Sequence, residues 1–391
     1  MRRLLATTVT LAAVLAASAC GGTESPSGDS GKPLTIAFPV PLTSGNKTAA
    51  DQMVNAAKLA VKKINENGGA GGRTLELKVY DDKLTADESA KVAQRSITQD
   101  GAEVILGGYT SIEGLAIREV VERRKIVYIA TSTISPQLTQ GATYTFRAAH
   151  DQGDYPVQMA ALYKQLGFTK PTVIHDDGPT GSTLFEPIVK ALQNEGLTPG
   201  KPIAFTLNST NVSTAIEAVK SQQPDSIIHI GSSGADAGLV LKTLSEQGVR
   251  LPVLGFGSLI SAEALNIGGA AYDQFPVYTL ANTQPSKPKM QEFAQLYATE
   301  YGGDAATTAA TLVEGAAQTW DGFEALRQAL EVTKGDTSGD ALVAALKGLA
   351  PFEGAAGKAG KAISFADSQN AYKEALTVFV LKDKRPVEAN Q

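Results

Sequence analysis

The stretch VILGGYTSIEG, residues 104–114, joins a short apolar run to an amphipathic segment that continues to Arg124. An apolar β-rich run, a glycine pair and a helix start are typical of the units that build parallel sheets with covering helices. Thr110 and Glu113 have the T-x-x-E spacing of a capping box, with Ser111 in the first turn of the expected helix. Because unpaired amides gather at a helix N-terminus, this stretch also predicts a pocket for an anion.

The same alternation of strands and helices extends along the chain. The first series of β-rich runs occupies residues 34–40, 75–81, 104–106 and 126–130. A second series begins after Arg147, with strands expected at 172–175, 203–206, 226–230, 252–256 and 275–280. Strands that alternate with helices of about a dozen residues predict parallel sheets with helices on both faces. The sequence therefore predicts an α/β protein with two doubly wound parallel-sheet lobes.

The rhythm changes after Leu280, where helices are expected in succession at 288–301, 307–332 and 339–349. A late β pair is expected at 362–365 and 376–381. Helices without strands of their own indicate that the chain returns to cover the first sheet and crosses back near Pro351. We therefore expect residues 34–150 plus 281–350 to form lobe 1, and residues 151–280 plus 351–391 to form lobe 2. Three crossovers would then make a hinge, with a cleft between the lobes.

Residues 1–19 have the anatomy of a secretory signal, with a positive start, an apolar core and small residues before Cys20. The run that ends at Cys20 resembles the lipobox of bacterial lipoproteins, in which the cysteine is lipidated, although Ala17 stands where leucine is usual. An ordinary cleaved signal followed by a chance cysteine is the alternative. Residues 20–33, including the lipidated cysteine, form a Gly/Ser/Pro-rich flexible tether. The sequence thus predicts an extracytoplasmic protein that is lipid-anchored to the cell membrane.

Composition and motifs argue against several other classes of protein. The formal net charge is −5 and basic residues are dispersed, which argues against a nucleic-acid partner. No G-x-S-x-G elbow, H-x-x-x-H pair or Walker A motif occurs, so we expect no catalytic residue, no metal and no cofactor. Cys20 is the only cysteine, so no internal disulfide can form. The lipid is the only membrane contact expected.

Several segments, in order, resemble the branched-chain amino-acid-type, leucine-binding-protein-like solute-binding proteins of ABC importers. They include IAFPVPLTSG, VILGGYTS, TFRAAHDQGDYP, TVIHDDGPTGSTLFEPIVKAL and AISFADSQNA. The resemblance spans residues 34–382 and implies the type I periplasmic-binding-protein fold, with a three-crossover hinge. It also implies a monomer that closes over a small solute and delivers it to permease and ATPase subunits. A lipoprotein of the same fold that senses the solute and signals to a membrane partner is the alternative.

In the first lobe, the resemblance implies that Ser111 and the Ser132–Thr133 region grip the carboxylate of the solute. The same hydroxyls could instead serve only as caps for their own helices, as Ser135 before Pro136 also suggests. Tyr109, and Phe256 in the second lobe, suit an apolar or aromatic tail, although both could equally be core packing. The cysteines of a disulfide common in the family would lie near Leu84 and Thr110 and are absent.

The second lobe departs from the family pattern. Gly257 stands where amino-acid binders carry the carboxylate that holds the ammonium group, and Ser233 stands where an aromatic residue often covers the solute. A buried ammonium group without an anionic partner is costly. Three carboxylates could replace the missing one: Asp154, Asp177 and Asp236. Otherwise the solute is a carboxylate or amide without an ammonium group and with an apolar tail against Phe256, which is the interpretation we adopt.

Overall fold

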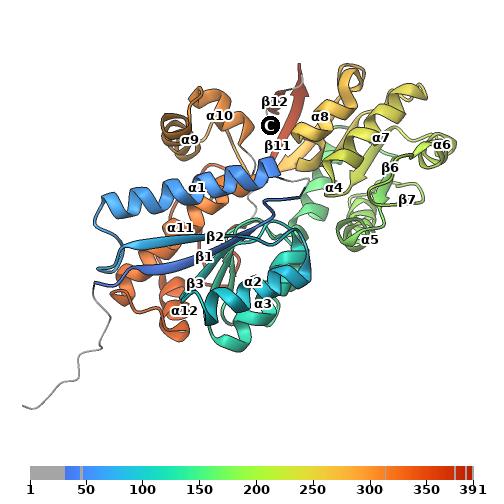
Figure 1. Cartoon of the computed structure of the whole chain (residues 1–391). Coiled ribbons are helices and arrows are strands. Elements are labelled where there is room, and N and C mark those ends of the chain that lie inside the picture. The colour runs from blue at the N-terminus through green and yellow to red at the C-terminus, as the bar shows by residue number, and fades with distance from the viewer. Residues whose placement is uncertain (1–30, 45–46, 313, 374–375, 384, 390–391) are drawn as a thin grey trace, which may run out of the picture.

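The computed structural model describes residues 31–44, 47–312, 314–373, 376–383 and 385–389. The predicted signal segment, Cys20 and the tether up to residue 30 lie outside the described residues. Figure 1 shows two α/β bodies side by side, with the carboxyl-terminal strands joined to the second one. No helix in the described ranges combines the length and the apolar character that crossing a membrane requires.

The first sheet has five parallel strands in the order β2-β1-β3-β4-β5. The strands are β1 (Leu34–Val40), β2 (Leu75–Asp81), β3 (Val104–Gly107), β4 (Val127–Ala130) and β5 (Thr145–Arg147). Its early helices are α1 (Lys47–Glu66), α2 (Ala86–Thr98) and α3 (Ser111–Arg124). Alternate residues of the buried strands serve opposite faces: Ile36 and Leu106 pack on the side of α1, whereas Ala37 and Ile105 pack against α2 and α3.

The second sheet has seven strands in the order β12-β11-β10-β9-β8-β6-β7. The parallel strands are β6 (Pro171–Asp176), β7 (Ile203–Phe205), β8 (Ser226–Ile230), β9 (Val253–Phe256) and β10 (Val277–Ala281). Its helices are α4 (Tyr155–Gln165), α5 (Pro179–Asn194), α6 (Ser213–Gln222), α7 (Gly234–Glu246) and α8 (Ala262–Gly268). Helices α4 and α5 cover one face of this sheet, and α6 to α8 cover the other. Like the first sheet, the second is therefore doubly wound, as predicted.

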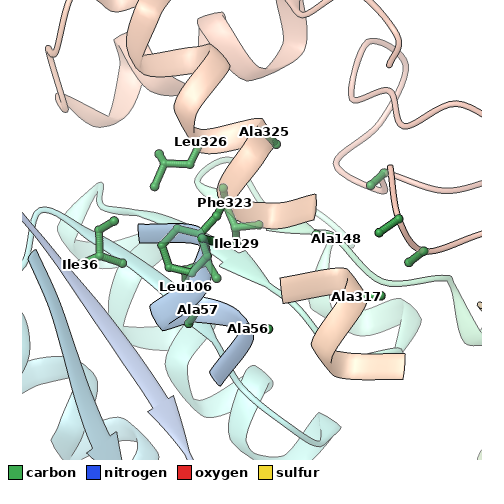
Figure 2. Close-up of a cluster of buried hydrophobic side chains, with 14 of the residues drawn as sticks. Ile36, Ala56, Ala57, Leu106, Ile129, Ala148, Ala317, Phe323, Ala325 and Leu326 are labelled. Atoms are coloured by element: carbon green, nitrogen blue, oxygen red, sulfur yellow. The ribbon is translucent and has the colours of Figure 1, made fainter. Parts of the chain in front are cut away.

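The segment after β10 returns to the first sheet. Its helices are α9 (Pro288–Tyr301), α10 (Ala305–Thr311), α11 (Glu314–Thr333) and α12 (Gly339–Gly348). Figure 2 shows Phe323 and Leu326 of α11 lying against Ile36, Leu106 and Ile129 of the sheet. The single helix expected at 307–332 is instead the pair α10 and α11.

The last crossover lies later than predicted. Residues 362–365 form no strand and make only the isolated bridge between Phe352 and Ile363. Their apolar side chains pack in the first core instead, where the Phe365 ring meets that of Phe146 edge-on at 5.3 Å. First-core contacts continue to Tyr372, and the chain joins the second sheet at β11 (Thr377–Lys382), antiparallel to β10 and β12 (Arg385–Glu388). The predicted crossing near Pro351 is therefore wrong, and we assign residues up to Tyr372 to lobe 1.

Candidate functional site

The loops after β3 and β4 form one surface at the carboxyl edge of the first sheet. Gly107 and Ala130 end these neighbouring strands in register, and the Thr131 amide donates to the Gly107 carbonyl at 3.1 Å. Gly108 has φ +80°, and a Cβ there would lie 2.4 Å from the Tyr128 hydroxyl. The second glycine of the pair therefore lets the two loops approach closely, at the edge where open α/β sheets bind ligands.

The start of α3 carries the predicted capping box. Thr110 is the N-cap, and its amide donates to the Glu113 carboxylate at 2.5 Å. Ser111 begins the helix and is half-buried. Ser132, on the neighbouring loop, is also half-buried, and neither serine hydroxyl has a hydrogen-bond partner among the described residues. The free amides and the dipole at this end of α3 add a local preference for an anion.

Thr133 has a different role from Ser132. Its side chain is fully buried, donates to the Thr110 carbonyl at 3.0 Å and packs against Gly114. It therefore holds the loop after β4 against the start of α3. Ser135 caps only a three-residue 3₁₀ turn, so of these two loops only the one after β3 leads directly into a long helix, α3. Tyr109 is half-buried and packs on the first core.

Arg147, at the end of β5, also holds the loop after β4 in place. Its side chain is fully buried and donates to the carbonyls of Ile134 at 2.6 Å and Ser135 at 2.8 Å. It also donates to Asn370 at 2.9 Å and pairs with Asp151, which follows it into the first crossover. Burial lowers the pKa of Arg147, and the Asp151 charge opposes that shift. Sequence reasoning missed this residue, because only the folded chain shows what it joins.

The second sheet presents the ends of β6, β8 and β9 side by side, with His175 opposite Ile230 and His229 opposite Gly255. Gly257 follows β9, and a Cβ built on it meets no atom of the described residues within 4 Å. The position where the family pattern has a carboxylate therefore has open space and no side chain.

The three carboxylates proposed as substitutes differ in their surroundings. Asp177 is exposed and accepts the Leu207 amide at 2.9 Å. Asp236 is buried, accepts the Asn208 amide at 2.9 Å and lies in the first turn of α7, for which Ser233 is the N-cap. Burial raises the pKa of Asp236, whereas the hydrogen bond from the Asn208 amide opposes that shift. Asp177 and Asp236 thus both hold the loop after β7. Asp154 is half-buried and ends a 3₁₀ turn, η2 (Gln152–Asp154), in the first crossover.

Asp176, at the end of β6, is an acidic residue that sequence reasoning did not select. It is 1% exposed, and its Oδ1 accepts the amides of Gly178 at 3.0 Å and Gly181 at 3.2 Å. Its Oδ2 is buried without a hydrogen-bond partner in the described part of the chain, and burial raises its pKa. This oxygen faces Gly231, where an added Cβ would approach it to 2.6 Å.

Aromatic residues line the first crossover between the sheets. The ring of Phe256 lies 4.2 Å from that of Tyr155, which meets His150 edge-on at 5.1 Å. Ile134, from the loop after β4, packs against this cluster. Burial, and then the Arg147 charge, lower the pKa of His150 to about 3, so its imidazole is neutral. Phe256 is only 5% exposed, so most of its ring is already covered by protein.

Other features of the surface do not coincide with these strand ends. One hollow of about 370 Å³ lies between α1 and α11, and another of about 340 Å³ lies beside β7 and α6. Neither is lined by Ser111, Ser132 or Gly257. The described residues contain no group of three or more side chains suited to hold a metal ion.

Comparison with known proteins decides the family. The family model described as "Periplasmic binding protein" matches residues 33–384. The chain belongs to the periplasmic binding protein family. The proteins of this family bind solutes and are not enzymes, so this binding protein is not an enzyme. A curated relative is Leu/Ile/Val-binding protein homolog 1 of Brucella suis, 25% identical over 275 residues, or 70% of this chain and 71% of the relative.

Solved structures confirm the fold of this periplasmic binding protein. A leucine-binding protein from Thermotoga maritima superimposes with a TM-score of 0.80 at 20% identity, over 91% of this chain and 98% of that one. A solute-binding protein of an ABC transporter from Rhodopseudomonas palustris, solved with 3,4-dihydroxybenzoic acid, gives a TM-score of 0.76 at 21% identity, over 91% and 95%. The predicted type I periplasmic-binding fold is therefore correct.

Proposed function

We propose that this periplasmic binding protein holds a small carboxylate at the start of α3 and delivers it to an ABC importer. The observation that carries the proposal is a pair of half-buried serine hydroxyls that find no partner among the described residues: Ser111 at the start of the 14-residue helix α3, and Ser132 on the neighbouring loop after β4. Two hydroxyl donors, free amides and a helix dipole together suit a carboxylate. Lobe 2 then closes over the solute, and the closed form docks on the permease.

We further propose that the solute lacks an ammonium group. Gly257 offers no anion, and Asp177 and Asp236 already accept backbone amides. Asp154, the third candidate, ends η2 in the first crossover and does not lie on the loop after β9. Desolvating an ammonium group without an anionic partner costs several kcal/mol. An aromatic or short-chain acid meets no such penalty, and its apolar part would lie toward Tyr109 and the edge of the Phe256–Tyr155 cluster. The Rhodopseudomonas palustris structure, solved with an aromatic acid, is a precedent on this fold.

A branched-chain amino acid is the second candidate. The curated Brucella relative is named for leucine, isoleucine and valine. Asp176 is a further acidic group that could turn toward an ammonium group, because its Oδ2 has no hydrogen-bond partner in the described part of the chain. Because Asp176 is 1% exposed, such contact requires a rearrangement of the loop after β8. That requirement ranks the amino acid below the plain carboxylate.

The lipid anchor on Cys20 and extracytoplasmic location complete the proposal. A sensing role, in which closure is reported to a membrane partner without transport, differs in the partner and not in the site. Uptake of the solute by cells that lack this protein separates the two roles: uptake is lost if the protein serves import. If uptake persists while a solute-dependent response is lost, the sensing role is correct.

Calorimetric titration with benzoate, 3,4-dihydroxybenzoate, leucine and isoleucine tests the proposed solute class. We expect the acids to bind, and S111A and S132A each to weaken binding by about 10- to 100-fold, because a hydrogen bond to a charged group is worth about 1.5–3 kcal/mol. S221A, on exposed α6 of lobe 2, is the matched control and should bind like the wild type. Tight leucine binding that survives S111A would exclude the proposal.

A further inference from the structure

Two buried carboxyl groups meet beneath the start of α3. Asp82 directly follows β2, and Glu113 lies in the first turn of α3. Both side chains are 0% exposed. The two side chains also contact each other, so two acidic groups share one water-excluded space.

Each carboxyl group has one oxygen with backbone partners and one without. Glu113 Oε2 accepts the Thr110 amide and the Thr110 hydroxyl, and Asp82 Oδ1 accepts the Leu84 amide at 3.2 Å. The other two oxygens, Glu113 Oε1 and Asp82 Oδ2, are buried and find no donor in the described part of the chain. Two carboxylate oxygens cannot face each other ionised without strong repulsion, whereas one proton between them makes a hydrogen bond.

The surrounding groups favour a single negative charge on the pair. Asp81 adds a further negative charge beside Asp82, and the Tyr128 hydroxyl below the pair donates to the Gly107 carbonyl at 3.2 Å. Lys83 is exposed and lies 3.8 Å from Glu88, on the outer side of the loop. Burial, and then the Asp82 charge, raise the pKa of Glu113, and burial raises the pKa of Asp82. The pair therefore shares one proton, and Glu113 Oε1 and Asp82 Oδ2 are the two oxygens that no other group in the described part of the chain donates to.

We propose that Glu113 is a positioning residue for the solute, and that the proton it shares with Asp82 keeps the start of α3 in its binding conformation. This inference rests on the proposed binding of a carboxylate at Ser111. Loss of the proton gives the pair a second negative charge and leaves Glu113 ionised in the first turn of α3, where the carboxylate of the solute binds. It also makes the loop after Asp82 and the start of α3 repel each other. Both effects weaken solute binding as the pH rises.

The test is benzoate affinity at pH 6 and pH 9, because the charge of benzoate is constant over this range. We expect the wild type to lose at least tenfold in affinity at pH 9. E113Q should bind with nearly equal affinity at both pH values, since its amide can accept from Thr110 and donate to Asp82 without a titrating proton. D82N should also be insensitive to pH, because its amide can donate to ionised Glu113. E119Q, on the exposed side of α3, is the matched control and should follow the wild type.

Infrared spectroscopy of the solute-free protein supplies a readout that does not depend on benzoate. We expect a band of a protonated carboxyl group at pH 7 that is absent in E113Q. If benzoate binds the wild type at neither pH while this band is present, the proposed solute class is wrong, but the proton shared by Glu113 and Asp82 is supported. If the band is the same in E113Q, or if E113Q loses affinity at pH 9 as the wild type does, the inference is wrong.

Discussion

Replacing Arg147 with methionine should be among the most damaging single substitutions in the first lobe. The guanidinium group is fully buried and bonds to the Ile134 and Ser135 carbonyls, to Asn370 and to Asp151. Methionine leaves the Asp151 carboxylate, which is 21% exposed, without its cation. Breaking a buried ion pair from one side typically costs about 3–5 kcal/mol. We therefore expect R147M to lower the free energy of unfolding by about 3–5 kcal/mol.

Urea unfolding at 25 °C, followed by circular dichroism, measures this loss. R147K keeps the charge but not the planar fork, so it should lose about 1–3 kcal/mol. R147M/D151N should be more stable than R147M because no unpaired charge remains. R123M, on the exposed face of α3, is the control and should change stability by less than about 0.5 kcal/mol. A loss below about 1 kcal/mol in R147M would show that Arg147 does not hold the loop after β4.

Three further predictions concern the site and its charges. G257D places a carboxylate in the open space beside β9. In calorimetric titration it should raise leucine affinity and lower benzoate affinity, each by about tenfold or more. Unchanged selectivity would mean that Gly257 does not face the solute. Because the pKa of Glu113 is raised, the folded protein keeps a proton that the unfolded chain releases. The free energy of unfolding should therefore fall, by at most about 1.4 kcal/mol per pH unit, as the pH rises from about 4.3 through that raised pKa, and E113Q should show a smaller slope in urea unfolding. Burial lowers the pKa values of His150 and His229 to about 3 and about 4, so the NMR signals of both rings should not titrate between pH 8 and pH 5, and a midpoint near 6.5 at either would contradict their burial.

Long, strongly patterned elements could be predicted from the sequence. The strand at 34–40 and the helix at 288–301 have the expected bounds, because continuous apolar character and regular spacing are local signals. The three-residue strand β5 and the edge strand β12 were not predicted, since neither has a pattern that separates it from a loop. Residues 362–365 have β-type composition, but Ile363 and Phe365 pack in the first core, a competition that no local signal reveals.

Part of the candidate site could likewise be predicted from the sequence, and part could not. The capping box at Thr110 and Glu113 could be predicted from spacing, and it places Ser111 where the α3 amides are free. The second role of Glu113, its contact with Asp82, depends on how β2 and α3 come together in the sheet. Thr133 and Ser132 look equivalent in the sequence, and the burial of Thr133 and its hydrogen bond to the Thr110 carbonyl separate their roles in the structure.

Native mass spectrometry of the protein incubated with equal amounts of benzoate, 3,4-dihydroxybenzoate and leucine tests the central claim most directly. We predict a complex with one of the two acids in the wild type and its loss in S111A. A complex formed only with leucine, and retained in S111A, would contradict the claim that this protein holds an ammonium-free carboxylate at the start of α3.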